Sequence, residues 1–267
     1  MKKKLLIVVS LVLAVAAIVT ASVMGTIAYM TSASKVSNVF TIGDVFITLN
    51  ESLVTENGVP VDDVTRTDRN SYHLMPGDTY IKDPAITVDA KTETCYLFLV
   101  TRNQITDIEA NHDGSNPDKP TMAEQMYKNG WAIYKDTSAG SRVWIYCGKD
   151  AEGNANVVGK YGSDGYSYTP MAVCGNERTP ADPTKVFVAA PNVRIPVFQE
   201  FSIRSDDGDK VKLYGGAEVS LNAVAIQASS EFGTLCSSEA IDNAWAAVIA
   251  QFPYIQDDLS NSNTPTT

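Results

Sequence analysis

Apolar and polar residues alternate along much of the chain, beginning near residue 36. The period of two predicts one strand over residues 36–42 and a second over 45–49, separated by Gly43 and Asp44. The polar segment 50–70 is predicted to be a loop. Residues 95–102 begin with six consecutive apolar or aromatic positions, a pattern typical of a strand in the middle of a sheet.

Further alternating runs predict more short strands, and two segments have helical spacing. The closing helix has Ser237 or Ser238 as its N-cap, and Ile241, Trp245 and Val248 fall on one apolar face. The second helix is a short one over residues 122–128. The other expected strands are 85–88, 131–134, 142–147, 166–173, 186–189, 193–203 and 219–227.

Many short strands, few helices and frequent turn residues predict a mainly β fold, a jelly roll or β-sandwich. Residues 51–106 and 183–256 are expected to form its core. Residues 107–182 are rich in Gly, Asn, Asp and Pro and are predicted to be a loop-rich insertion. The C-terminal amphipathic helix closes the domain, and residues 257–267 form a polar tail.

Residues 1–28 have the pattern of a signal peptide. Three lysines are followed by an apolar run over 5–23 and then by small residues, which predicts cleavage between Ala28 and Tyr29. An apolar run of this length also fits an uncleaved membrane anchor, and the sequence leaves that alternative open. The remainder is expected to be secreted or held at the cell surface, with membrane contact only through an uncleaved leader.

The charge balance argues against a nucleic-acid partner. The 267 residues carry 31 acidic and 21 basic side chains, a formal net charge of −10. Because the leader holds three of the basic residues and none of the acidic ones, the rest of the chain is more acidic still. Such a surface repels phosphate, and the scattered Lys and Arg residues form no basic run that would offset it.

The sequence contains no recognisable catalytic or metal-binding motif. Its two histidines, His73 and His112, have no partner at the spacing of an HExxH zinc site, and no GxSxG elbow is present. We therefore expect no catalytic residue, no cofactor and no metal.

Four cysteines, none in a CxxC spacing, allow three complete disulfide pairings in an exported chain. The sequence does not choose among them. A Cys147–Cys174 bond is slightly favoured, because both residues fall in the loop-rich insertion, where a covalent link would replace missing core.

Several motifs resemble the TasA/camelysin family, whose members are exported and processed by the SipW type of signal peptidase. They are GTIAYMT at residues 25–31, NVFTIGDVFITLNE at 38–51, LMPGD at 74–78 and VAIQA at 224–228. Met30 and Ser32 depart from the family pattern, which has Phe and an acid there. The resemblance covers both ends of the mature chain and nothing within 107–182.

The resemblance implies a jelly-roll subunit of extracellular matrix or biofilm fibres, with other copies of itself and a SipW-type peptidase as partners. Residues 29–40, including Tyr29, Val36, Asn38 and Phe40, would be the donor strand that completes a neighbour's sheet. Cleavage would free this segment, and an open sheet edge is a template for it. Head-to-tail exchange propagates as an open filament. Pairing of residues 36–40 within their own domain is the alternative.

Two other functions remain open. Camelysin-like proteins are described as metallopeptidases, although this chain lacks the zinc motif. A monomeric surface adhesin is the other alternative, with aromatic residues of the insertion, such as Trp131 and Trp144, forming a contact surface.

Overall fold

The structure is a computed structural model, and it is mainly β, as the alternation predicts. Strands dominate, the largest sheet is curled, and the helices are few and short. The structure describes residues 31–136, 141–150, 152–160, 162–163, 165–175, 185–189, 194–206 and 208–255. The leader and the polar tail lie outside these residues.

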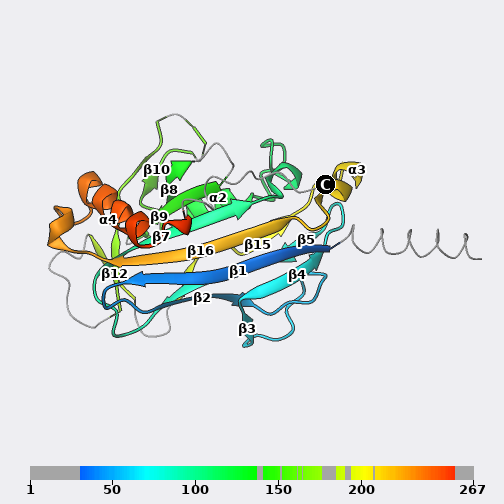
Figure 1. Cartoon of the computed structure of the whole chain (residues 1–267). Coiled ribbons are helices and arrows are strands. Elements are labelled where there is room, and N and C mark those ends of the chain that lie inside the picture. Colours follow the sequence, from blue (N-terminus) through cyan, green and yellow to red (C-terminus); the bar gives the residue numbers. More distant parts are fainter. Residues whose placement is uncertain are drawn as a thin grey trace, which may run out of the picture.

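The largest sheet has eight strands among the described residues (Figure 1). Six of them follow the order β13-β12-β7-β16-β1-β4, and β9 pairs with both β7 and β8. Their bounds are β1 Thr31–Ile42, β4 Arg69–His73, β7 Cys95–Asn103, β8 Trp131–Asp136, β9 Ser141–Tyr146, β12 Ala172–Cys174, β13 Val186–Val188 and β16 Glu218–Gln227.

The antiparallel pair β7–β16 forms the centre of this sheet and separates two hydrophobic cores. Side chains of a strand point alternately to opposite faces. Leu97 and Leu99 of β7 therefore reach the first core, whereas Tyr96 and Phe98 reach the second. The predicted face of β16 is confirmed, because Leu221 and its period-two neighbours line the first core while Val224 and Ile226 line the second.

A second group of strands packs against the first core. A four-stranded sheet has the order β14-β6-β2-β3, and β15 pairs with β5. Ile47 and Leu49 of β2 and Ile86 and Val88 of β6 belong to the same buried cluster as Leu97 of β7. The bounds are β2 Ile47–Ser52, β3 Arg66–Thr67, β5 Thr79–Ile81, β6 Ala85–Val88, β14 Arg194–Pro196 and β15 Glu200–Ser202.

The second core is covered by helix α4 (Ser238–Gln251), near one end of β7 and β16 in Figure 1. The Ser237 side chain accepts a hydrogen bond from the Ala240 N–H, so the predicted N-cap is confirmed. Trp245 packs against Phe98 of β7, with ring centroids 5.1 Å apart. No helix among the described residues is long and apolar enough to span a bilayer.

The 107–182 segment adds strands to the main sheet, because β9 and β12 both pair with β7. It also contains helix α2 (Met122–Lys128), whose predicted bounds are confirmed, and a small β10–β11 pair (Val157–Val158 with Ser167–Tyr168). The remaining short elements are α3 Gly208–Val211, η1 Thr106–Ile108, η2 Lys212–Tyr214 and η3 Ser230–Phe232.

One expectation is wrong: residues 50–70 are not a continuous loop. The strand β2 extends to Ser52, β3 occupies Arg66–Thr67, and β4 begins at Arg69. The sequence misled because inward positions of these strands carry the polar residues Glu51 and Asn70, which break the apolar alternation.

Candidate functional site

The strand β1 lies between β16 and β4, and Figure 1 shows it as the long blue arrow beside them. It runs parallel to β16, with Ala33 opposite Glu218 at the start of the register and Ile42 opposite Ile226 at the end. It runs antiparallel to β4, where Lys35 is opposite Arg69. Both backbone edges of β1 are therefore paired within the same chain.

Three of the four residues predicted for the donor strand lie in β1. Val36 pairs with Leu221 and Phe40 with Val224, and the register shifts between Val36 and Val39, so Asn38 falls in the irregularity. Tyr29 and the predicted cleavage site after Ala28 lie outside the described residues, and so does the leader. The pairing seen for residues 36–40 is the within-domain arrangement that the sequence left open.

β1 holds β4 onto the large sheet. Among the described residues, β4 pairs with β1 alone, whereas β16 is also paired with β7 on its other edge. Val39 packs against the first core and Ile42 against the second. Without β1, the facing edges of β16 and β4 would both have unpaired N–H and C=O groups and the sheet would lose contacts on both faces.

A tight turn at Gly43 connects β1 to β2. Gly43 has φ +87°, and its carbonyl accepts a hydrogen bond of 2.9 Å from the Val45 N–H. A β-carbon at this position would come within 2.8 Å of the Gln227 Cβ at the end of β16. The turn therefore requires glycine both for its dihedral angle and for the close approach to β16.

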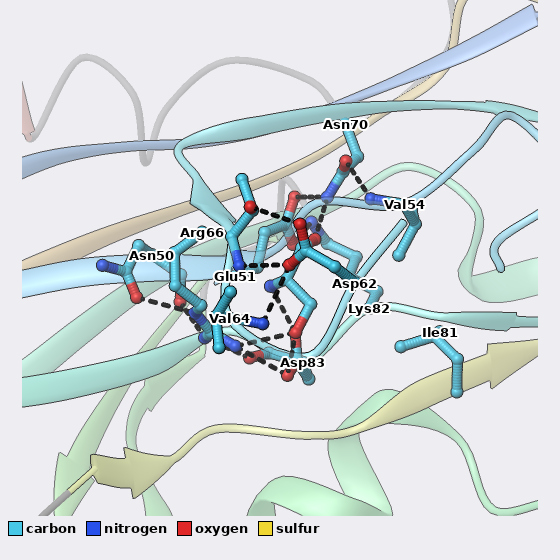
Figure 2. Close-up of polar contacts among 12 residues, drawn as sticks. Asn50, Glu51, Val54, Asp62, Val64, Arg66, Asn70, Ile81, Lys82 and Asp83 are labelled. Carbon is cyan, nitrogen blue, oxygen red and sulfur yellow. Dashed lines mark hydrogen bonds and ion pairs between the residues drawn. The ribbon is translucent and has the colours of Figure 1, made fainter. Parts of the chain in front are cut away.

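A second feature is a buried ion pair between Glu51 and Lys82 (Figure 2). The Glu51 Oε2 and Lys82 Nζ atoms are 2.7 Å apart, and the exposed fraction of each side chain is zero. Glu51 lies two residues after Leu49, on the inward face of β2. Lys82 lies two residues after the buried Tyr80 and directly follows β5. Period-two alternation thus places both charges where core residues are expected.

Asn70, on the inward face of β4, completes the cluster. Its Nδ2 donates to Glu51 Oε1 at 2.9 Å and to the Ser52 carbonyl at 2.8 Å, while its Oδ1 accepts from the Val54 N–H at 3.0 Å. These partners fix the orientation of the amide, since the Val54 N–H requires an acceptor. One carboxylate therefore binds the amine on one oxygen and the amide on the other.

An outer ion pair lies beside this cluster. Arg66 Nη1 lies 2.8 Å from Asp83 Oδ2, and Asp83 also accepts hydrogen bonds from the Ser52 N–H and hydroxyl. Arg66 donates further to the Asn50 side chain and carbonyl, which ties β3 to β2. The two acids and two bases cancel in charge, so the group is neutral as a whole.

Burial dominates the electrostatics of Lys82. It lowers the pKa of the ammonium, because the charged form loses its hydration, and the neighbouring Glu51 carboxylate opposes that effect. Glu51 is the only hydrogen-bond acceptor for Nζ among the described residues. An ammonium has three N–H donors, and here one acceptor serves them. The site therefore favours the neutral amine more than water does.

The predicted cysteine pair remains a prediction. Cys147 and Cys174 both belong to the second core, and no disulfide joins them in the described part of the chain. Cys236 packs against the same core, whereas Cys95 belongs to the first core, on the opposite face of the sheet. The structure thus places three of the four cysteines on one face and separates Cys95 from them.

The residues named for the alternative functions are dispersed or buried. His73 ends β4, while His112 is exposed in the turn after η1. No group of three or more His, Cys, Asp or Glu residues suited to a metal occurs among the described residues. Trp131 and Trp144 are buried, and their Nε1 atoms donate to the Pro196 carbonyl and to Thr101. These tryptophans are core residues, not the contact surface expected of an adhesin.

Comparison with known proteins adds no relative. No family model matches the chain, and no match was found among curated proteins or solved structures.

Proposed function

We propose that the protein is an exported structural subunit of extracellular matrix fibres, with a jelly-roll fold that assembles by donor-strand exchange through β1. The sequence resemblance to the TasA/camelysin family supports this function. So does the position of β1, which comes first among the described strands and pairs along both edges with strands far away in sequence. The observation that carries the proposal is that β16 and β4 leave between them a place for one strand, which β1 of the same chain fills here and which β1 of another copy would fit with the same register.

After exchange, β1 would make the same backbone hydrogen bonds to β16 and β4, but the strand would come from another copy of the chain. The Gly43 turn is the covalent link between β1 and the rest of the domain, so opening that turn releases the strand into a neighbour. Each subunit would then fill the slot between β16 and β4 of the next one. Because donor and acceptor surfaces differ, the contact is heterologous and the chain of subunits grows without closing.

Electron microscopy of the secreted, processed protein tests this function. We expect filaments from the intact mature chain and none from a variant that lacks residues 29–37. A variant that lacks the polar tail 257–267 is the control and should still form filaments. A mature protein that stays monomeric at high concentration would exclude assembly through this strand.

A secreted metallopeptidase is the second function that the resemblance suggests. Cleavage of casein that is lost with a chelator, and lost again when His73 or His112 is replaced, would favour it. If filament-forming protein does not cleave casein, the structural role is the only one of the two functions that is supported.

A further inference from the structure

We propose that Lys82 and Asn70 form an intramolecular isopeptide bond, with Glu51 as the proton-transferring group. Glu51 and Asn70 lie on β2 and β4, Lys82 directly follows β5, and all three side chains are buried. Figure 2 shows the three side chains close together. Glu51 Oε2 lies 2.7 Å from Lys82 Nζ, and Glu51 Oε1 lies 2.9 Å from Asn70 Nδ2. An amine nucleophile, an amide and a carboxyl group between them are the components of a transamidation.

The surroundings of Nζ favour a nucleophile over a structural cation. Glu51 is its single acceptor within the described residues, and the Lys82 side chain has no surface exposed to bulk solvent. Transfer of one proton from Nζ to Glu51 removes both buried charges at once and leaves a lone pair on the nitrogen. The desolvation that lowers the pKa of Lys82 acts in the same direction.

The surroundings of Asn70 suit the electrophile. Its carbonyl oxygen accepts the Val54 N–H, so a buried donor already points at the atom that becomes negative when the carbonyl carbon is attacked. The Asn70 nitrogen, which becomes the leaving group, donates a hydrogen bond to Glu51 Oε1, the carboxylate oxygen that does not bind Lys82. The carboxyl group can therefore take a proton from the attacking nitrogen and give one to the departing nitrogen.

The bond changes balance without an oxidant or a second reactant. The Lys82 Nζ to Asn70 Cγ bond forms and the Asn70 Cγ to Nδ2 bond breaks. Of the two protons that the ammonium loses, one reaches Nδ2 through Glu51 and leaves as part of ammonia, and the other stays on Glu51. The products are a secondary amide, ammonia and a protonated carboxyl. Escape of ammonia to solvent makes the step irreversible, and confinement in the core supplies the proximity that a lysine and an amide lack in water.

The bond itself does not depend on assembly, whereas the mechanical use that its location suggests rests on the proposed function. Asn70 lies on β4, the strand that holds one edge of β1, and Lys82 directly follows β5. A bond between them would close residues 70–82 into a covalent ring, on the side of the sheet where β4 accepts β1. Tension applied through β1 would then load a covalent connection beside β4 as well as backbone hydrogen bonds.

Mass spectrometry of the purified full chain tests the proposal directly. After prolonged incubation at neutral pH, followed by reduction and denaturation, the intact mass should be lower by one ammonia than the mass calculated from the observed N-terminus. Trypsin should release a branched peptide that joins the Asn70 and Lys82 segments, because an acylated lysine is not cleaved. An unshifted mass with separate, linear Asn70 and Lys82 peptides would overturn the proposal.

Matched variants separate this bond from other losses of ammonia. Lys82→Arg keeps the charge but removes the nucleophile, and Glu51→Gln removes the proton-transferring carboxyl, so both should keep the full mass. Lys91→Arg changes an exposed lysine and should still lose ammonia. A cyclic imide at Asn70 would show the same mass loss without a branched peptide and would persist in Lys82→Arg, which overturns the proposal. If a variant fails to fold, the branched peptide of the unchanged chain still decides.

Discussion

Lys82 Nζ lies 2.7 Å from Glu51 Oε2, and neither side chain has any exposed surface. Such a pair gives little net stability over an apolar substitute, because desolvation offsets the attraction, yet removal of one partner leaves a buried group without compensation. The second consequence can be measured on this chain.

Lys82→Met should lower the free energy of unfolding by about 3–5 kcal/mol, the usual cost of breaking a buried pair from one side. Chemical denaturation measures the difference. Lys212→Met is the matched control, because Lys212 pairs with Asp209 at the surface, where side-chain exposures are 53% and 94%. That change should cost no more than about 0.5 kcal/mol. Equal losses of unfolding free energy in Lys82→Met and Lys212→Met would contradict a special penalty for breaking the buried pair.

Glu109 should make stability depend on pH. Burial raises its pKa from 4.5 to about 7, and hydrogen bonds from the Met122 N–H and Asn103 only partly oppose that effect. Between these values the unfolded chain releases a proton that the folded chain retains, so the unfolded state is favoured. Stability should therefore fall by about 3 kcal/mol as pH rises from 4.5 to 7 and level off above it.

Denaturation at several pH values checks this dependence. In Glu109→Gln the downward slope should vanish, whereas Glu239→Gln, at an exposed site on α4, should retain it. A slope that survives in Glu109→Gln would assign the effect to another group.

Gly43→Ala should weaken the turn between β1 and β2. The residue would be strained at φ +87°, and its β-carbon would approach the Gln227 side chain too closely. A loss of about 1 kcal/mol or more in unfolding free energy is expected. Gly114→Ala has a similar φ of +76° but nothing within 4 Å, so it controls for backbone strain alone. Size-exclusion chromatography should show more multimer for Gly43→Ala than for Gly114→Ala if this turn opens during exchange.

Cys95 should resist both oxidation and alkylation in the folded protein. Burial raises the pKa of its thiol, and it faces the first core while the other cysteines line the second. Peptide mapping without reduction should therefore find any disulfide among Cys147, Cys174 and Cys236. A bond to Cys95 would contradict the assignment of faces. The Cys147–Cys174 bond would confirm the sequence prediction, and a Cys147–Cys236 bond would replace it.

Periodicity was enough to predict the strands at the centre of the main sheet and both of the longer helices. Ala85–Val88 and Met122–Lys128 have the expected bounds. The structure adds a capping box at Thr121 and Glu124, a signal that the prediction did not use. The mainly β class followed from the same patterns.

The buried cluster was missed because it breaks those patterns. Glu51, Asn70 and Lys82 occupy inward positions next to Leu49, Tyr72 and Tyr80, where alternation would assign apolar residues. A polar residue at an inward position of a strand was the available signal. It could not show that Glu51 on β2, Asn70 on β4 and Lys82 just after β5 meet, since that depends on how the three strands pack. Pairing of β1 with β16, nearly two hundred residues away, depends on tertiary structure in the same way.

The central claim, that β1 exchanges between subunits, is tested most directly by a disulfide trap at the β1–β4 register. Lys35 and Arg69 lie opposite each other, so Lys35→Cys combined with Arg69→Cys places two thiols across this pair. The processed double variant is oxidised under assembly conditions and run without reducing agent. The account predicts a ladder of covalent multimers that collapses to monomer on reduction and is absent from either single variant. A double variant that forms only an internal disulfide and migrates as monomer would contradict strand exchange.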